Sequence, residues 1–505
     1  MQALSCKGQN MVKVNRRQFI ILTTASAVTA SVASIALAQN NRNPFKSQAL
    51  SPKIYKSADG LLKLDLEAGS HPISLGGKRA YLLGYNGQVP APRLEAQAGD
   101  TVRIRFTNNL TQPTNLHYHG LHVTPTGNAD NPFLEIPPGE SLTYKFTIPK
   151  NHRSGTYWYH PHHHGYVAEQ VFGGLAGLFI IRGELDEIAE IQAAKEEFLV
   201  LQDFALDRNG RIQSPNHMDM MMGREGELLT VNGQIKPTFS IASGGLLRLR
   251  FLNASPSRFY RLALENHPFY LVATDGGALA EPVEFKELLL APGERAEMLV
   301  RGEREPKQYR LLNLPYNRGG MEMMEDEMGM MGDSSHMMGG KSQVNPQILA
   351  TLTYQGFVST LPLPKQLIPV ETLPEPKTVR RLELSMEEEM APGMGMSFTF
   401  NGKAFDPNKI NTQVQVNTVE DWELVNVDLD RMDHPFHLHV NPFQVILRNG
   451  EPEPYRAWKD TVLVRGGETV RIRIPFRDFP GKTVYHCHVL DHEDLGMMGI
   501  VNIQA

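Results

Sequence analysis

Near its C-terminus the chain reads His486-Cys-His-Val-Leu-Asp-His-Glu-Asp-Leu-Gly-Met497. On a β-strand, residues i and i+2 share a face, so we expect the imidazoles of His486 and His488 to point one way and the Cys487 thiolate the other. His492 and Met497 follow closely. A thiolate, imidazoles and a thioether together form the ligand set of a blue copper site. This segment therefore predicts a copper-binding strand.

The 18 histidines of the chain favour one spacing. Chance would place His-x-His less than once in such a chain, whereas it occurs five times, at His117/His119, His160/His162, His162/His164, His437/His439 and His486/His488. Imidazole suits copper, zinc, iron and nickel alike, so these pairs alone leave the metal open. The segment around Cys487 favours copper. The spare histidine of His434-Pro-Phe-His-Leu-His439 supplies the imidazole that its blue site still lacks.

The order of residues 486–488 also implies a route for electrons. Cys487 belongs to one copper site, while the histidines bonded to it belong to a cluster on the other side of the strand. Electrons that arrive at the thiolate can pass through the Cys487 backbone over roughly 10 Å, given strand geometry. A copper cluster held by eight imidazoles with open positions suits the binding of O₂ and its reduction without release of partly reduced oxygen.

Residues 1–38 have the pattern of an export signal. A basic region ends in Asn15-Arg-Arg-Gln-Phe-Ile20, a mildly apolar stretch follows, and Ala36-Leu-Ala38 is a small-x-small cleavage pattern. The paired arginines look like a twin-arginine signal, with an ordinary secretory signal as the alternative. We therefore expect a periplasmic or otherwise exported protein. Because the other cysteine, Cys6, lies in this leader, Cys487 would have no disulfide partner in the mature chain. It is therefore either a buried thiol without a chemical role or a functional thiolate.

Beyond the leader, β-branched and aromatic stretches alternate with Gly, Pro and Asn turns, which predicts an all-β protein. Three segments echo one another: Ala98-Gly-Asp-Thr-Val-Arg-Ile-Arg-Phe106, Ser243-Gly-Gly-Leu-Leu-Arg-Leu-Arg-Phe251 and Gly466-Gly-Glu-Thr-Val-Arg-Ile-Arg-Ile474. Each reads as a turn and a strand with apolar residues inward and arginines outward. A second echo, Pro138-Gly-Glu and Pro292-Gly-Glu, precedes two further strands. The repetition predicts three related β-sandwich domains.

Composition shifts place the domain boundaries. We expect domains at residues 53–185, 198–360 and 378–505. A charged Glu/Ala stretch at 186–197, with one short helix, would join the first two, and a proline-rich extended linker at 361–377 would lead into the third. Residues 321–340 combine Met, Gly and acidic residues without a period, so we expect a surface insertion in the middle domain.

Four segments look like the copper motifs of the multicopper oxidase family: Leu116-His-Tyr-His-Gly120, Tyr157-Trp-Tyr-His-Pro-His-His-His-Gly165, His434-Pro-Phe-His-Leu-His439 and the His486–Met497 segment. The resemblance spans about residues 53–505, and its motifs are complete and in order. It implies three consecutive cupredoxin-like Greek-key β-sandwich domains, the third with the type 1 copper. It also implies an oxidoreductase that takes single electrons from a substrate and reduces O₂ to water. A copper-free relative would have lost ligands, and none is missing here.

Carried over position by position, the resemblance implies four copper ions. The type 1 ion would take His434, Cys487, His492 and Met497; the type 2 ion His117 and His437; and the two type 3 ions His119, His160, His162, His439, His486 and His488. Asp130 and Glu493 would relay the protons that O₂ reduction consumes, the alternatives being a turn-forming aspartate and a surface acid. Histidines 122, 152, 163 and 164 match no ligand position, and we expect them behind the ligands or in solvent.

Composition excludes some partners. Removal of the four basic residues of the leader takes the formal net charge from −5 to −9. An acidic surface argues against nucleic acid and is compatible with cationic substrates or metal ions. Past the leader, no apolar run reaches the roughly 18 residues of a membrane span. We expect a monomer without a membrane span.

Methionine gathers in residues 218–222, 321–338 and 386–396, which hold sixteen of the 22 in the chain. Thioethers prefer Cu(I). The insertion resembles that of bacterial copper efflux oxidases, which implies that residues 321–338, with Glu322, Glu325, Asp326 and Glu327, collect Cu(I) for oxidation; a low-complexity surface loop is the alternative. Three functions stay open: a cuprous oxidase, a laccase-like oxidase of phenols or other organic reductants, and a copper-sequestering protein with incidental turnover.

Overall fold

The computed structural model describes residues 52–319, 345–388, 396–428 and 431–505. The chain divides into two compact units, residues 1–48 and 49–505, and only the second contains described residues. The expected export signal and the Met-rich insertion at 321–340 therefore lie outside the described residues. Among the residues that are described, no helix has both the length and the apolar character needed to cross a membrane.

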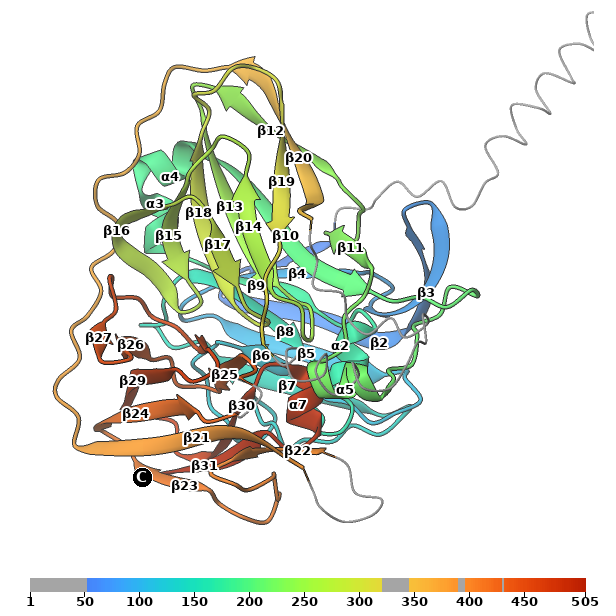
Figure 1. The fold of residues 1–505 in the computed structure, drawn as a ribbon, viewed down its shortest axis with the longest axis vertical. Coiled ribbons are helices and arrows are strands. Elements are labelled where there is room, and N and C mark those ends of the chain that lie inside the picture. Colours follow the sequence, from blue (N-terminus) through green and yellow to red (C-terminus); the bar gives the residue numbers. More distant parts are fainter. Residues whose placement is uncertain (1–51, 320–344, 389–395, 429–430) are drawn as a thin grey trace, which may run out of the picture. The chain divides into compact units, whose positions relative to one another are not determined.

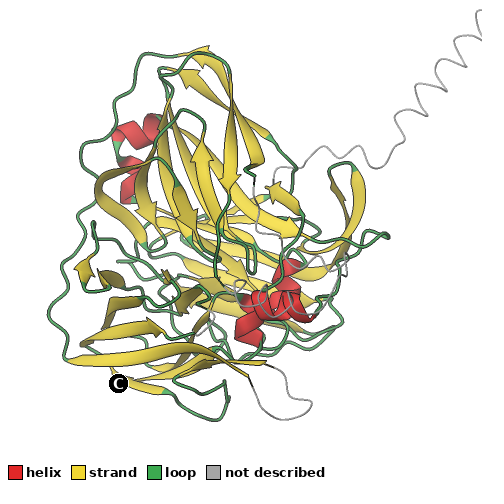
Figure 2. Ribbon diagram, in the orientation of Figure 1, coloured by secondary structure: helices red, strands yellow, loops and turns green. Residues whose placement is uncertain are grey.

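Six β-sheets form three sandwiches that follow one another along the chain (Figures 1 and 2). The cause is the alternation of apolar and polar residues along the strands. In the long second strand Leu62, Leu64 and Leu66 are buried, while the residues between them are exposed. Because side chains of a strand alternate between faces, such a strand turns its apolar face to a core. Each sandwich has a large core of its own, which confirms the all-β expectation.

The first sandwich pairs the sheet β1-β4-β9-β8-β6 with the sheet β3-β2-β5-β7. Its strands are β1 (Ile54–Lys56), β2 (Leu61–Leu75), β3 (Lys78–Tyr85), β4 (Arg93–Gln97), β5 (Thr101–Asn108), β6 (His117–His119), β7 (Ser141–Thr147), β8 (Gly155–His160) and β9 (Gly177–Arg182). The short helix α2 (Val167–Phe172) packs its apolar face on Leu490 of the third sandwich. The carboxylate of Asp494 accepts the backbone N–H groups of Gly165 and Ala168, which ties the two sandwiches together.

The second sandwich pairs β11-β10-β13-β18-β15-β16 with β12-β20-β19-β14-β17. Its strands are β10 (Lys195–Phe204), β11 (Leu228–Val231), β12 (Thr238–Ser243), β13 (Leu246–Asn253), β14 (Tyr260–Leu264), β15 (Phe269–Thr274), β16 (Gly277–Phe285), β17 (Leu288–Leu290), β18 (Arg295–Arg301), β19 (Gln308–Leu314) and β20 (Gln347–Phe357). The linker before β10 holds two helices, α3 (Glu184–Glu187) and α4 (Ala189–Ala193), where one was expected, because Ile188 is extended between them. A further helix, α5 (His217–Met222), lies between β10 and β11.

The third sandwich pairs β22-β21-β24-β29-β26-β27 with β23-β31-β30-β25-β28. Its strands are β21 (Thr378–Glu388), β22 (Met396–Phe400), β23 (Thr412–Gln415), β24 (Thr418–Asn426), β25 (His434–Leu438), β26 (Gln444–Arg448), β27 (Glu451–Pro452), β28 (Thr461–Val464), β29 (Thr469–Phe476), β30 (Gly481–Cys487) and β31 (Met498–Gln504). Helix α7 (Leu490–Asp494) follows β30. Residues 361–377, expected as an extended linker, contain neither helix nor strand.

The sequence echoes do not all fall on equivalent strands. The first two copies form β5 and β13, each of which lies beside a parallel partner, β2 and β10. The third copy forms β29, which pairs antiparallel with β24 and so occupies the place of β7 and β18. Those two strands follow the Pro-Gly-Glu echoes. The third copy therefore corresponds to the strands that follow Pro138-Gly-Glu and Pro292-Gly-Glu. Its own turn, Gly466-Gly-Glu468, has the same Gly-Glu ending as theirs.

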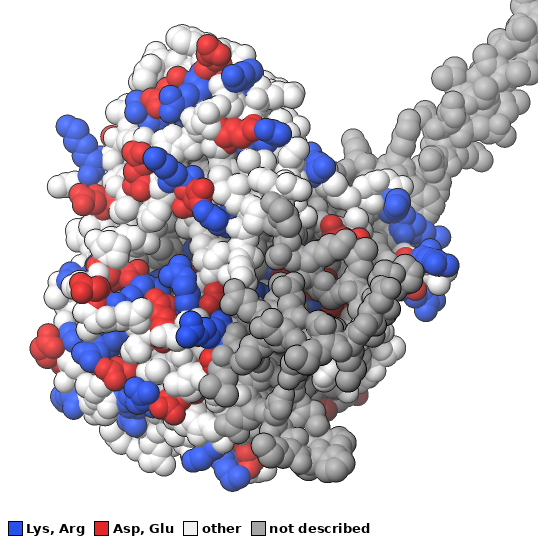
Figure 3. All heavy atoms as spheres, viewed as in Figure 1, with Lys and Arg blue, Asp and Glu red and all other residues white. Residues whose placement is uncertain are grey.

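The arginines of the three echoes were expected to face outward, and in the middle copy that outward face is covered. Arg103 and Arg105 of β5 are exposed, but Arg248 and Arg250 of β13 are buried. The first sandwich covers that face, and the guanidinium groups pair with Asp186, Glu196 and Glu297. A buried cation needs such partners, because desolvation alone would be costly. On the face drawn in Figure 3, exposed basic side chains likewise lie beside acidic ones.

Candidate metal centres

Eight histidines meet where the first sandwich contacts the third. Strands β6 and β8 and the residues just past β8 carry one half of the cluster, and β25, β30 and the residues just past each of them carry the other. Their ligand atoms form three groups in which all atoms lie within 4.8 Å of one another: His117/His119/His437, His119/His160/His488 and His162/His439/His486. These are the eight histidines that the motifs assign to the type 2 and type 3 sites. The structure therefore brings together residues more than 300 positions apart.

Among the described strands, one His-x-His pair of the cluster has both of its members on the strand. His117 and His119 both lie on β6, whereas His162, His439 and His488 each lie just past the end of a strand. Pro161 separates His162 from β8. The second imidazole of these pairs is thus placed by the turn that follows the strand. His164 joins none of the three groups, so the overlapping pair His162/His164 is not a ligand pair.

The nitrogen atoms inside this cluster face one another at short range, an arrangement that suits a shared cation. His486 donates its Nδ1–H to the Cys487 carbonyl at 2.8 Å, so its Nε2 lone pair lies 3.2 Å from Nε2 of both His162 and His439. Within the described residues, Nε2 of His117 and of His437 makes no hydrogen bond. The pKa values of His117 and His439 lie well below the usual range of histidine; burial is the main cause, and the neighbouring imidazoles add to it. Neutral, converging imidazoles fit copper.

The predicted blue copper site assembles around Cys487. Its Sγ lies 3.6 Å from Nδ1 of His434 and 3.9 Å from Nδ1 of His492. The other nitrogens are occupied, because Nε2–H of His434 donates to Asp428 at 3.1 Å and that of His492 donates to the carbonyl of Met221 at 2.8 Å. Both Nδ1 atoms are therefore free to face the sulfur. Burial raises the pKa of the Cys487 thiol, so a thiolate there needs a metal beside it.

Met497 is fully buried in the same core as Cys487, and its carbonyl accepts the Cys487 N–H at 3.0 Å. Its role as axial ligand stays a prediction. The two centres are joined through β30, since Cys487 is bonded to His486 and its carbonyl accepts the hydrogen bond of that imidazole. A covalent bond and a hydrogen bond thus link the thiolate site to the histidine cluster.

Both predicted carboxylates lie at the cluster. Oδ1 of Asp130 lies 2.8 Å from Nδ1 of His117 and accepts the Tyr118 N–H at 2.9 Å. Glu493 lies 3.3 Å from Nε2 of His162 and 3.1 Å from Nδ1 of His486, and its side chain is fully buried. The alternative of a surface acid is therefore wrong for Glu493. Burial raises the pKa of Asp130 to about 8 and that of Glu493 to about 7.

Several residues at these centres escaped sequence reasoning. Phe398 stacks on His492 with ring centroids 3.8 Å apart, and Asp428 holds His434. Asp460 contacts two cluster histidines, as described below. The charged pair Lys459-Asp460 directly before the apolar stretch that forms β28 was the one available signal. That signal names no partner.

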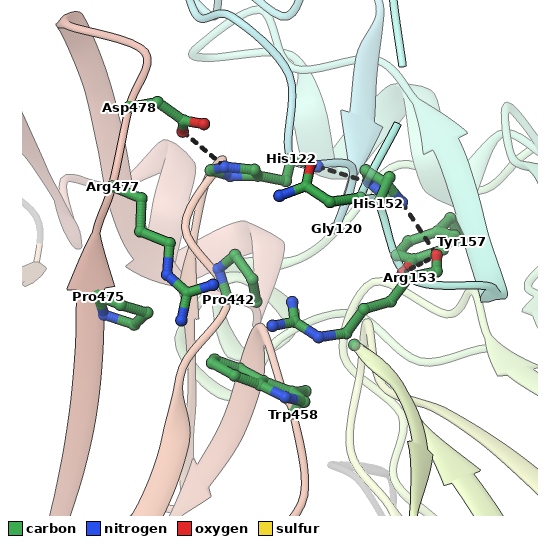
Figure 4. A pocket seen from close by; sticks show the side chains of 12 residues that line it. Gly120, His122, His152, Arg153, Tyr157, Pro442, Trp458, Pro475, Arg477 and Asp478 are labelled. Carbon is green, nitrogen blue, oxygen red and sulfur yellow. Dashed lines mark hydrogen bonds and ion pairs between the residues drawn. The ribbon is translucent and has the colours of Figure 1, made fainter. Parts of the chain in front are cut away.

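Four of the remaining histidines line two cavities. His163 and His164 are partly buried at the wall of a cavity of about 780 Å³ that reaches His162. His122 and His152 line a smaller pocket formed by all three sandwiches (Figure 4). There His122 pairs with Asp478 at 2.7 Å, and its backbone N–H donates to Nε2 of His152. None of these four side chains belongs to a group of converging metal-binding atoms among the described residues. His217, on α5, is exposed.

Comparisons with known proteins agree with this geometry. Three multicopper oxidase family models match residues 68–186, 199–329 and 374–505. The multicopper oxidase mco of Staphylococcus haemolyticus is 32% identical over 429 residues, 83% of each chain. The cell division protein FtsP of Photorhabdus laumondii is 28% identical over 96% of this chain and 98% of its own.

Solved structures show the same fold. A multicopper oxidase from Campylobacter jejuni, described as a metallo-oxidase, superposes with a TM-score of 0.78 at 33% identity over 90% of this chain and 94% of its own. A bacterial laccase-like multi-copper oxidase from Ochrobactrum sp. gives 0.74 at 28% identity over 90% and 99%. Three cupredoxin-like domains are thereby confirmed, and membership of this family implies copper, with which the histidine clusters are consistent. The chain belongs to the multicopper oxidase family and is an oxidoreductase.

Proposed function

We propose that this protein oxidises Cu(I) to Cu(II) and passes the electrons to O₂. Four Cu(I) ions, one O₂ and four protons would give four Cu(II) ions and two waters. The observation that carries the proposal is the position of the methionine-bearing helix α5. Helix α5 packs on α7, and the carbonyl of its Met221 accepts the Nε2–H of His492 at 2.8 Å. A segment rich in Cu(I)-preferring thioethers thus touches a candidate type 1 ligand.

Four resident copper ions are part of this proposal. His434, Cys487, His492 and Met497 would hold the type 1 ion, and the eight clustered histidines would hold the other three. Copper so bound supplies one-electron redox chemistry and positions for O₂. The ten imidazoles, the thiol and Met497 are all buried, which supports stable binding rather than exchange with solvent.

The protein's own residues would handle the protons. Glu493 lies between His162 and His486, and its raised pKa lets a carboxyl oxygen hold a proton near neutral pH. Asp130 is placed in the same way beside His117. The cavity of about 780 Å³ reaches His162 and gives O₂ and water a path to this side of the cluster.

The test compares O₂ uptake with Cu(I) and with a bulky phenol. Replacing the partly buried Met218, Met220 and Met222 by leucine keeps volume and removes sulfur. We expect the KM for Cu(I) to rise and phenol turnover to stay unchanged. Met298→Leu, in the buried core of the second sandwich, is the matched control. Equal Cu(I) kinetics in the triple variant and the control would disprove the role of α5.

Deletion of residues 321–340 extends the test to the insertion outside the described residues. We expect cuprous oxidase activity to fall sharply, with phenol turnover intact or raised. An unchanged cuprous rate would refute a role for the insertion.

Two other functions give different outcomes in the same assay. A laccase-like oxidase, as the Ochrobactrum relative is described, would turn over phenols faster than Cu(I). A copper-sequestering protein would consume little O₂ with either donor. The FtsP relatives show that this sequence family includes proteins named for cell division, so the assay is needed.

We further propose that residues 1–38 direct export by a twin-arginine-type signal to the periplasm. The paired Arg16-Arg17 supports this. Changing both to lysine should trap the precursor in the cytoplasmic fraction; normal export of that variant would count against this route.

A further inference from the structure

Within its described residues the second sandwich contributes no ligand to the four candidate ion sites, yet one of its turns reaches the cluster. The turn runs through residues 291–294 into β18, which begins at Arg295. We propose that Arg295 and Asp460 are positioning residues that together hold His119 in the orientation that binds copper. The proposal rests on the assignment of His119 as a ligand, and it adds the middle domain to the assembly of the cluster.

Asp460 accepts hydrogen bonds from one cluster histidine of the first sandwich and one of the third. Its Oδ1 accepts the Nε2–H of His119 at 3.0 Å, and its backbone carbonyl accepts the Nδ1–H of His437 at 2.8 Å. The Thr461 hydroxyl donates to the same Oδ1 at 2.9 Å. The imidazoles of His119 and His437 are stacked 3.7 Å apart. One carboxylate and its peptide therefore fix two rings together.

Arg295 holds that carboxylate from the other side. Its Nη1 and Nη2 donate to the two oxygens of Asp460 at 2.7 and 2.5 Å. The remaining donors go to backbone carbonyls, with Nε bonded to Thr156 at 3.0 Å and Nη2 to Asp275 at 2.9 Å. Both side chains are almost fully buried. A bidentate guanidinium–carboxylate pair fixes orientation as well as distance, and this pair joins all three sandwiches.

The hydrogen bond decides which nitrogen of His119 faces the cluster. With Nε2 protonated and bonded to Asp460, the free lone pair is on Nδ1, which lies 3.4 Å from Nε2 of His160. For metal-bound histidines, the partner of the second nitrogen fixes the tautomer and the ring angle. Thr461 Oγ1 also lies 3.2 Å from Nε2 of His119, but its hydroxyl donates to Asp460, so the carboxylate orients both groups.

Gly120 makes room for this arrangement. A Cβ at residue 120 would lie 2.4 Å from Nη2 of Arg295 and 2.4 Å from Oδ2 of Asp460, and the backbone φ is +86°. The residue next to the ligand is therefore free of a side chain where the ion pair approaches. A purely structural ion pair would not need to sit against a ligand in this way.

The experiment separates positioning from simple stability. The double variants Arg295→Met with Asp460→Asn, and Arg295→Met with Asp460→Leu, both remove the buried charges as a pair, which is often neutral for stability. Only asparagine keeps an oxygen that can accept from His119. We expect the Leu variant to bind cluster copper about ten- to hundredfold more weakly, as loss of such a partner does at metal sites. The Asn variant should stay near the wild type.

Copper equivalents are measured by mass spectrometry after dialysis against graded chelator, with the blue absorption of the Cys487 site as an internal reference. Arg258→Met with Asp203→Asn removes another buried pair of the second sandwich that contacts no candidate ligand, and serves as control. Equal copper retention in the Leu and Asn variants would overturn the proposal, as would equal loss in both. His119→Ala tests the underlying assignment separately: full copper content there would sink the ligand set itself.

Discussion

Replacing Gly293 by alanine would press a methyl group against the imidazole of His488. A Cβ at this position would lie 2.6 Å from Cδ2 and 2.7 Å from Nε2 of that ring. Ordinary van der Waals contact begins near 3.4 Å, so the ring must move by about 0.8 Å. Metal–ligand distances tolerate changes of about 0.2 Å. We therefore expect cluster copper to bind about ten- to hundredfold more weakly.

The chain offers a matched control in Gly139→Ala. Gly139 occupies the echoed Pro-Gly-Glu turn of the first sandwich with φ of +84°, against +83° at Gly293, and nothing lies within 4 Å of its added Cβ. Both variants therefore incur the same backbone cost of about 1–2 kcal/mol for a left-handed alanine. Only Gly293→Ala also displaces a candidate ligand.

The assay measures copper equivalents under chelator challenge, together with the unfolding free energy of the metal-free protein. Gly293 does not contact Cys487, so the blue absorption should persist in both variants. If Gly293→Ala retained as much copper as Gly139→Ala, either His488 would not be a ligand or the turn would yield without moving it. The reasoning from steric contact would then be refuted.

Three further outcomes are expected. Burial lowers the pKa of His152 from 6.5 to about 3, so between these pH values the unfolded chain takes up a proton that the folded protein excludes, and stability falls with falling pH. Between pH 6.5 and pH 5 the free energy of unfolding of the wild type, measured by urea titration, should fall by at most about 2 kcal/mol more than that of His152→Gln. Free energies that change equally with pH in the two proteins would contradict this. Phe398→Ala should cost about 3–5 kcal/mol and shift the blue absorption, because Phe398 stacks on His492, whereas Phe251→Ala should cost as much without a shift. Arg224→Met leaves the buried carboxylate of Asp491 without its cation and should cost about 3–5 kcal/mol in thermal or urea unfolding; a loss below about 1 kcal/mol would show that the pair is dispensable.

Sequence reasoning succeeded where short-range pattern decides the outcome. The spacing after Cys487 named His492 as its partner, because a strand and the turn after it fix which side chains can converge; His434 came from a separate motif, as the histidine left over there. The period of two in the segment that forms β5 identified its buried and exposed faces. The same reasoning failed at Arg248 and Arg250, since alternation shows which face a side chain takes and not what covers that face.

The amino-acid sequence by itself determined the chemistry of the ligands, the all-β architecture and the repeated domains. Only the tertiary structure decided which groups stand behind the ligands. His119 in the first domain and Asp460 in the last are 341 positions apart, and Arg295 comes from the middle domain. The physical reason is that ligand identity is written in local spacing, whereas the orientation of each imidazole depends on the partner of its second nitrogen, and that partner is supplied by packing between domains.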